Sequence, residues 1–212
     1  MKRTITFLSI IAIIATASIN AQEEESPFSI GLDIYSSYIW RGAKFGSGPA
    51  FQPCVDFTTG DLSIGAWGSV NSSIDEALEM DLYAAYSIGD LGIGITDYYF
   101  GGSWLSDSTH YIEPALSYGI GDLSLMGAYM FAPDFSEGDM YFEIGYTLGS
   151  VDLALGAGDG QYTDDEEFMI CNISMGTSKE IKITEEFSLP VSGSVLLNPS
   201  TGGFFITVGV SF

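Results

Sequence analysis

Few side chains in this sequence could perform nucleophilic or metal chemistry. His110 is its one histidine, and Cys54 and Cys171 are its two cysteines. A serine nucleophile needs a base within hydrogen-bond reach and a third group that orients the base. Nothing in the spacing around Ser108 and His110 supplies both, and one histidine with two separated cysteines does not favour a transition-metal site. We therefore predict no enzyme, no catalytic residue, no metal site and no cofactor.

The acidic run Asp164–Glu167 is the one other cluster with ligand chemistry. Its carboxylates are the oxygen ligands that Ca²⁺ prefers. The run lacks the spaced acidic positions of a calcium-binding loop, so it is interpreted as the solvated tip of a loop.

The chain as a whole is strongly acidic and yet apolar. It carries 28 Asp and Glu against 6 Lys and Arg, which gives a formal net charge of −22, and its mean hydropathy is +0.25. Phosphate backbones need a basic surface, so nucleic acid is not an expected partner. A sequence with both characters is not an acidic disordered chain, and it must separate the two characters in space.

The N-terminus has the three regions of a secretory signal peptide. Lys2 and Arg3 form a basic head, residues Ile5–Ala15 are mostly apolar, and Thr16–Ala21 are small or weakly polar. The apolar run is shorter than the roughly 20 residues of a spanning helix. We predict a signal peptide over residues 1–21, a short acidic segment over residues 22–27 and one domain over residues 28–212.

Apolar and polar residues alternate with a period of two along most of that domain, which indicates strands with two different faces. In one such segment Phe142, Ile144 and Tyr146 alternate with Glu143 and Gly145. The predicted strands are Phe28–Arg41, Pro49–Thr59, Leu62–Val70, Leu78–Ile88, Leu91–Phe100, Thr109–Ile120, Leu123–Ala132, Met140–Leu148, Val151–Gly158, Glu167–Lys179, Phe187–Leu197 and Gly203–Phe212.

Short and long connections alternate between these strands. Three connections repeat the same compact turn, at Gly60-Asp61, Gly89-Asp90 and Gly121-Asp122, and glycine followed by aspartate is hairpin chemistry. Transmembrane barrels have short periplasmic turns and longer outer loops. The pattern predicts an all-β, antiparallel up-and-down transmembrane β-barrel of about 12 strands in the outer membrane of a Gram-negative bacterium. Both termini then lie on the periplasmic side.

Apolar residues of the alternating pattern are assigned to the lipid face and small or polar residues to the lumen. Aromatic residues of the apolar face gather at both strand ends, as in interfacial girdles. Trp40 is assigned to the girdle at the end away from the short turns. The last strand places Phe204, Ile206, Val208, Val210 and Phe212 on one face and ends on phenylalanine. Such an ending is similar to the signal that the barrel-assembly machinery reads, so this machinery and outer-membrane lipid are the predicted partners.

The two cysteines are expected to be free thiols rather than a disulfide. In the predicted register Cys54 faces the lumen and Cys171 faces lipid, on strands that are not neighbours. Two cysteines in an exported protein suggest a disulfide, but this placement favours two free, buried thiols over a bridge.

The segment Asp33–Gly42 resembles the opening strand of the TorF family of outer-membrane porins. That family has a Tyr-x-Trp-Arg-Gly motif at the end of an aromatic first strand, which corresponds here to Tyr38, Trp40, Arg41 and Gly42. Residues Pro49–Pro53 and Gly65–Ser69 are similar to its next two strands. The resemblance implies an outer-membrane barrel and, as an expectation, porin activity.

Seven charged residues face the lumen in the predicted register, and six are acidic: Asp33, Arg41, Asp56, Asp81, Glu113, Glu143 and Asp152. Rings of carboxylates favour cations, so one interpretation is a selectivity lining, with Asp33 and Asp56 at similar depth. The other is a plugged lumen, in which Arg41 pairs with an acid and Trp67 helps to fill the space. The preferred function is therefore a porin for small hydrophilic solutes, cationic or neutral. The alternatives are a closed barrel that acts through acidic outer loops and an outer-membrane lipid hydrolase.

Overall fold

The computed structural model describes residues 26–71, 78–133, 135 and 137–212, and twelve strands within these residues close into one barrel. The predicted signal peptide and residues 22–25 lie outside the described residues, as do parts of the links at 71–77 and 133–139. The wall strands are β1 (Phe28–Tyr35), β4 (Ala50–Thr59), β5 (Leu62–Asn71), β6 (Leu78–Ile88), β7 (Leu91–Tyr99), β8 (His110–Ile120), β9 (Leu123–Phe131), β10 (Gly138–Leu148), β11 (Val151–Gly160), β12 (Glu166–Lys182), β13 (Ser188–Asn198) and β14 (Gly203–Ser211).

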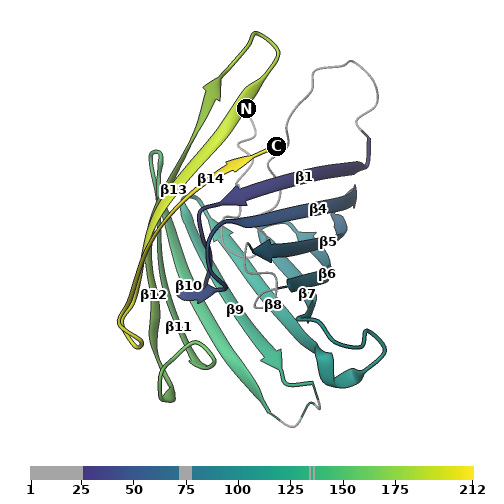
Figure 1. Cartoon of the computed structure of the whole chain (residues 1–212), viewed down its shortest axis with the longest axis vertical. Coiled ribbons are helices and arrows are strands. Elements are labelled where there is room, and N and C mark those ends of the chain that lie inside the picture. Colours follow the sequence, from purple (N-terminus) through teal and green to yellow (C-terminus); the bar gives the residue numbers. More distant parts are fainter. Residues whose placement is uncertain (1–25, 72–77, 134, 136) are drawn as a thin grey trace.

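Consecutive wall strands pair antiparallel, with β4 next to β1, and β1 closes the barrel against β14 (Figure 1). The seam between β1 and β14 is short, with Asp33, Ile34 and Tyr35 opposite Ser211, Val210 and Gly209. The predicted all-β, closed antiparallel barrel is confirmed. A 3-10 helix, η1 (Asp107–Thr109), precedes β8. Within the described residues, no helix has the length and apolar character needed to cross a membrane.

The connections are sorted by length between the two ends of the barrel. The three Gly-Asp turns place their glycines at positive φ, as a tight hairpin turn requires. The exception on this side is the β12–β13 hairpin, which continues past the end of the wall in Figure 1, where its last residues pair only with each other. Glu186 lies at the tip of this extension.

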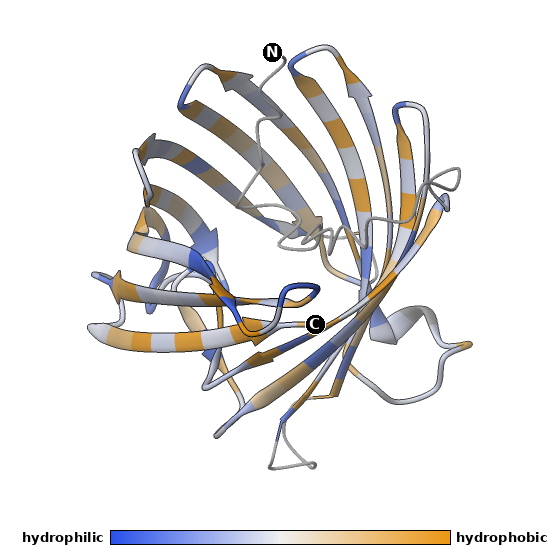
Figure 2. Ribbon diagram, turned by 90° about the horizontal axis from the view of Figure 1, so that it is seen from above, coloured by the Kyte–Doolittle hydropathy of each residue, from blue (hydrophilic) through white to orange (hydrophobic). Residues whose placement is uncertain are grey.

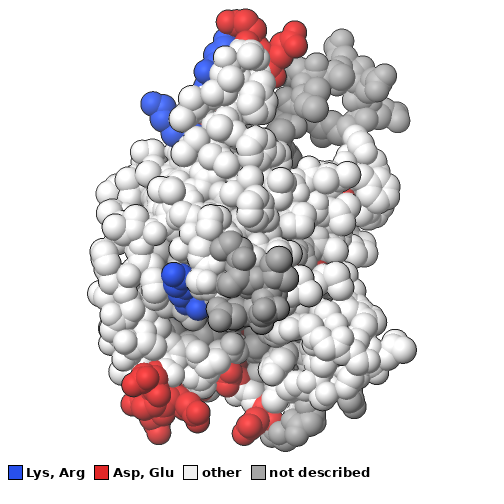
Figure 3. Space-filling model, viewed as in Figure 1, with Lys and Arg blue, Asp and Glu red and all other residues white. Residues whose placement is uncertain are grey.

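The outward face of the wall is apolar. On β14, Phe204, Ile206 and Val208 are 62%, 65% and 56% exposed, whereas Thr207 between them is 8% exposed. Apolar and polar residues alternate along the strands when the barrel is seen from above (Figure 2). On the face shown in Figure 3, acidic side chains gather at the two ends of the molecule and are nearly absent from its middle. The sheet therefore separates the acidic and apolar characters of the chain, as expected.

The predicted first strand, Phe28–Arg41, is wrong at its end, because β1 stops at Tyr35. Ser36 and Ser37 follow: the Ser36 amide donates to the carbonyl of Val208, and Thr207 Oγ1 donates to the carbonyl of Ser37. The chain then forms a separate two-stranded sheet of β2 (Tyr38–Trp40) and β3 (Ala43–Phe45). β2 keeps the alternation of β1, so the pattern alone cannot show that it has left the wall.

The predicted lipid-facing position of Cys171 is also wrong. Gly156 pairs with Asn172 and Ala157 pairs with Ile170, so Cys171 is the extra residue of a β-bulge. A bulge shifts the faces of a strand by one residue, and Cys171 is fully buried rather than exposed. Both cysteines are free, in agreement with the expectation of two thiols.

The closed wall predicts heat-modifiable migration in SDS gels. Unboiled protein should keep its sheet and migrate away from the position of boiled protein, because SDS does not readily open a barrel without edges. A chain truncated after Asn198 lacks β14 and cannot close, so it should migrate at one position with or without boiling. Identical migration of the full chain in both states would contradict the closed barrel.

Candidate functional site: a hairpin anchored inside the barrel

The segment Tyr38–Phe45, called the lumen hairpin below, consists of β2, β3 and the two residues between them. Tyr38 pairs with Phe45 and Trp40 pairs with Ala43, which leaves Arg41 and Gly42 as the turn. Their φ angles are 50° and 82°. Positive φ at both central residues is the signature of a type I′ turn, which favours glycine but strains arginine.

Arg41 is buried and binds a carboxylate of the opposite wall. Its Nη1 donates to Glu113 Oε2 at 2.6 Å, and its Nη2 donates to Glu113 Oε1 at 2.9 Å. Nη1 also donates to the hydroxyl of Tyr162 at 2.8 Å. The guanidinium carbon lies 4.4 Å from the ring centroid of Trp40 and 4.4 Å from that of Tyr141. Arg41 is therefore held by a two-pronged ion pair and by two aromatic faces, a combination that lysine cannot reproduce.

The ion pair also compensates the charge of the buried guanidinium. Arg41 lies on the hairpin and not on a wall strand. Burial alone would lower the pKa of its guanidinium, but the carboxylate of Glu113 outweighs burial and raises that pKa well above the ordinary value. Loss of either partner would leave an uncompensated buried charge, which is strongly destabilising.

Gly42 sits where a side chain has no room. A Cβ built on Gly42 would lie 2.0 Å from the carbonyl oxygen of Cys171, the bulged residue of β12. The side-chain amide of Asn198 donates to the carbonyl of Gly42 at 3.3 Å and to that of Tyr162 at 3.2 Å. The tip of the hairpin thus contacts β12 and β13 directly, and glycine is needed both for φ and for this approach.

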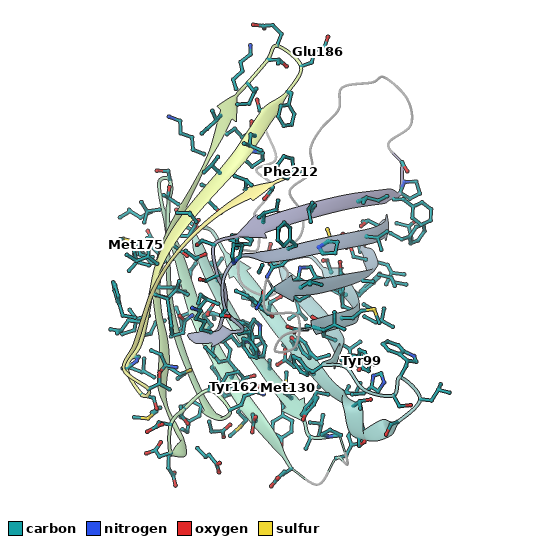
Figure 4. All side chains as sticks on the ribbon, viewed as in Figure 1. Tyr99, Met130, Tyr162, Met175, Glu186 and Phe212 are labelled. Atoms are coloured by element: carbon teal, nitrogen blue, oxygen red, sulfur yellow. The ribbon has the colours of Figure 1, made fainter. Side chains whose placement is uncertain are left out.

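Aromatic contacts place the lumen hairpin inside the barrel. The ring centroid of Tyr38 is 5.5 Å from that of Trp67 on β5, and the ring centroid of Trp40 is 5.6 Å from those of Tyr98 on β7 and Tyr162. Tyr162 follows β11, and in Figure 4 it lies within the outline of the barrel. A segment of eight residues that reaches β5, β7, β8, β12 and β13 can do so only from the lumen. The predicted place of Trp40 in the lipid-facing girdle is wrong.

The predicted lumen residues occupy different environments. Five of them are at least nine-tenths buried: Arg41, Asp56, Asp81, Glu113 and Glu143. Within this predicted set, only Arg41 and Glu113 form an ion pair. Asp152 accepts a hydrogen bond from Thr147 Oγ1 at 2.8 Å near a short turn. Asp33 is bonded to Ser211 at the seam.

Asp33 and Asp56 do not lie at similar depth. Asp33 is opposite Gln52, and Asp56 is opposite Ser29. They are four ladder positions apart, about 13 Å at about 3.3 Å per residue. The predicted register counted every residue up to Arg41 as part of a wall strand. In the structure residues 38–45 pair with each other and do not belong to the β1–β4 ladder.

Three residues of the interior were missed by sequence reasoning. Glu79 lies two residues before Asp81 on β6, and the period of two already predicts a shared face for the pair. Tyr98 donates to Glu113 Oε1 at 3.1 Å and could be found in the same way on β7. Tyr162 lies in a loop, where no periodicity exists to place it.

His110 has both ring nitrogens engaged. Nδ1 lies 2.9 Å from Asp97 Oδ1, and Nε2 lies 2.9 Å from the carbonyl oxygen of Trp104. The rings of Tyr99 and Trp104 pack against the imidazole. Among the described residues, no serine hydroxyl is bonded to His110. The histidine thus links the loop after β7 to the start of β8. That the protein is not an enzyme stays a prediction.

Comparison with known proteins gives a family for the chain. A model described as "Bacterial protein of unknown function (Gcw_chp)" matches residues 21–187, which is most of the sequence. The chain belongs to this family. The Gcw_chp match extends from the N-terminal region through β12 and includes the lumen hairpin. Its description states no activity, so the resemblance to TorF porins remains a prediction. No curated protein matches the chain.

Several solved porin structures are distantly similar. A triple mutant of the Rh. blastica porin is 14% identical, with a TM-score of 0.42, over 77% of this chain and 55% of that one. The chain therefore spans about half the length of that porin. Pseudomonas aeruginosa OccK5 (OpdH) is 9% identical, with a TM-score of 0.36, over 88% of this chain and 67% of that one. These likenesses are too distant to assign a solute.

Replacement of Arg41 should destabilise the barrel more than replacement of another cation of the same hairpin. Arg41→Met leaves Glu113 buried and unpaired, with an expected loss of about 3–5 kcal/mol in the free energy of unfolding. Urea unfolding in detergent micelles, followed by tryptophan fluorescence, measures the change. Lys44→Met on β3 removes an exposed charge and should change stability by less than about 0.5 kcal/mol.

The double variant Arg41→Met/Glu113→Gln separates the ion pair from general packing. It removes both charges, so it should lose less stability than the sum of the two single variants. Strict additivity would show that the two side chains do not interact as the structure places them.

Gly42→Ala and Gly60→Ala form a matched pair that isolates the contact at the hairpin tip. Both glycines have positive φ, but a Cβ at Gly60 would meet nothing within 4 Å. Gly60→Ala should therefore cost only the backbone strain of about 1–2 kcal/mol. Gly42→Ala adds the collision with Cys171 and should lower the urea midpoint clearly further. Equal losses for the two variants would show that the tip is not docked on the bulge.

Proposed function

We propose that this protein is a bacterial outer-membrane β-barrel that passes small hydrophilic solutes, with cationic or neutral solutes preferred, through a lumen narrowed by the hairpin Tyr38–Phe45. The observation that carries this proposal is the pairing of an apolar outer face with an interior that holds buried carboxylates on several wall strands. Both termini and the short turns are assigned to the periplasm.

The outer face supports membrane insertion. Large apolar side chains such as Ile30, Leu116 and Phe142 are half or more exposed at outward positions of different strands. Exposure of so much apolar surface to water would be unfavourable by about 25 cal/mol per Å², and contiguous apolar surface of this kind marks contact with a membrane or a partner. The alternating ladder satisfies the backbone groups inside the wall, as hydrocarbon requires.

The interior supports a preference for cations. Five buried acids of the wall strands are assigned to the lumen: Asp56, Glu79, Asp81, Glu113 and Glu143. Arg41 is the one buried cation of the described residues. Acidic linings attract positive solutes and repel anions. Because the lumen hairpin reaches across this space, any passage is narrower than that of an open barrel of the same strand number.

A second candidate function is a closed barrel that acts through its acidic outer loops. The anchoring of Arg41 and Gly42 on the opposite wall favours this candidate. A hairpin held by an ion pair, by the bond from Arg41 to the Tyr162 hydroxyl and by one hydrogen bond from Asn198 does not move freely. The two candidates differ in whether the hairpin leaves a path for ions.

Single-channel recording in planar bilayers separates the two candidates. Wild-type protein should give small, cation-preferring conductance. Replacement of Tyr38–Phe45 by Gly-Ser repeats of the same length should raise that conductance severalfold, because it removes the aromatic side chains from the lumen. The loop-tip variant Asp164→Asn/Asp165→Asn is a control that should leave the wild-type conductance in place.

Each remaining outcome is informative. A silent wild type with a conducting Gly-Ser variant would favour the closed barrel. Silence of both proteins, with normal migration in the SDS gel, would refute passage through this barrel. Preference for anions would contradict the role assigned to the acidic interior.

A further inference from the structure

Most buried carboxylates of the lumen accept hydrogen bonds from a neighbouring side chain, and Asp81 is the exception. Glu113 accepts both hydrogen bonds from the Arg41 guanidinium, and Asp56 accepts one from the hydroxyl of Tyr83. Glu143 accepts two at its Oε2, from Tyr141 and Asn172, while its Oε1 is buried without a partner. Asp81 has no such donor among the described residues. It is 6% exposed, and its Oδ1 is buried without a hydrogen-bond partner.

The neighbours of Asp81 raise the free-energy cost of burying its carboxylate without a partner. The charged groups that act on Asp81 are Glu79, Asp97 and Glu113, all of them carboxylates. Glu79 is itself 5% exposed and lies two residues before Asp81 on the same face of β6. An unpaired carboxylate beside a second one in a buried space is strongly unfavourable.

No protein cation is left to compensate the pair. Arg41 is committed to Glu113 in a one-to-one ion pair, and His110 is bonded to Asp97. Of the lysines in the described part of the chain, Lys44, Lys179 and Lys182 are exposed. Glu79 and Asp81 together therefore carry up to two negative charges that the described residues do not neutralise.

Other oxygen atoms surround the pair. The hydroxyl of Tyr38, on the lumen hairpin, is hydrogen-bonded to Glu79 and lies close enough to Asp81 to interact electrostatically with it. Trp67 is directly opposite Asp81 across the β5–β6 ladder, and its ring packs against Tyr38. Two carboxylates and a phenol thus meet where β6 faces the hairpin.

We propose that Glu79 and Asp81 hold a hydrated divalent cation of the Mg²⁺ class in the lumen, beside the hairpin. Mg²⁺ keeps several of its waters and is typically bound by one or two carboxylates, and its charge matches that of the pair. In the described part of the chain, no three His, Cys, Asp or Glu side chains are placed to hold a metal together. Water and the Tyr38 hydroxyl therefore complete the shell, and the ion joins β6 to the hairpin.

Binding can be measured without conductance, so the test stands apart from the proposed porin function. The probe is Tb³⁺ added to refolded protein in detergent, with tryptophan excitation and competition by Mg²⁺. Wild type should give saturable Tb³⁺ emission that excess Mg²⁺ removes. Trp67→Phe should greatly reduce this Mg²⁺-sensitive emission, whereas Trp104→Phe, in the loop after β7, should leave it unchanged.

The carboxylates are tested by near-isosteric variants. Asp81→Asn and Glu79→Gln should each weaken Mg²⁺ competition by about tenfold or more, because ligand charge sets the affinity of such sites. Glu143→Gln is the matched control, since it removes a lumen carboxylate that already has hydrogen-bond donors, and it should keep the wild-type affinity. Mg²⁺ should also raise the unfolding temperature of wild type but not of Asp81→Asn, because a ligand stabilises the state that binds it.

Two results would overturn the proposal. One is wild-type emission that Mg²⁺ does not displace, which would mean that protons rather than a metal compensate the pair. The other is wild-type Mg²⁺ affinity in Asp81→Asn or in Glu79→Gln. If one variant fails to show the gel shift of folded protein, the other variant and Tyr38→Phe decide, and unchanged affinity in both contradicts the site.

Discussion

The ion pair between Arg41 and Glu113 is the interaction on which the interior of this barrel depends. Both side chains are buried, and their two hydrogen bonds join a turn of the lumen hairpin to a wall strand 72 positions further along the chain. A buried ion pair is seldom a source of net stability compared with apolar packing, but it penalises arrangements that separate its members. In this barrel it specifies where the hairpin lies, and the rings of Trp40 and Tyr141 sandwich the guanidinium in that place.

The β-bulge at Cys171 is the second feature of the wall that contacts the hairpin. It lies where the tip of the hairpin meets the wall, with the Cys171 carbonyl against Gly42. The same bulge turns the Cys171 side chain inward, so one inserted residue sets both the face of a cysteine and the docking point of the hairpin. Bulges are often found where a sheet must accommodate a functional element.

The charge distribution follows from the same geometry. A closed sheet allows its outer face to be apolar and sends polar residues to the ends and the lumen. In the lumen each carboxylate needs a donor or a cation, since burial without one is costly. Three acids have such partners: Glu113 has Arg41, Asp56 has Tyr83, and Glu143 has Tyr141 and Asn172. The negative charge that remains lies at Glu79 and Asp81. The hairpin is thus bordered by the part of the wall where two buried carboxylates lie without a cation of the described residues beside them.

The sequence by itself determined the wall of this protein. Alternation with a period of two placed β6 at Leu78–Ile88 without error, and the Gly-Asp turns located three of the hairpins, because strand faces and tight turns are set by residues close together in the chain. Only the tertiary structure decided what fills the barrel. The hairpin Tyr38–Phe45 has the same alternation as a wall strand, and its inward position depends on Glu113, Cys171, Tyr162 and Asn198, which are distant in sequence. A periodic pattern records that a segment has two faces, but it does not record which distant residues those faces will meet.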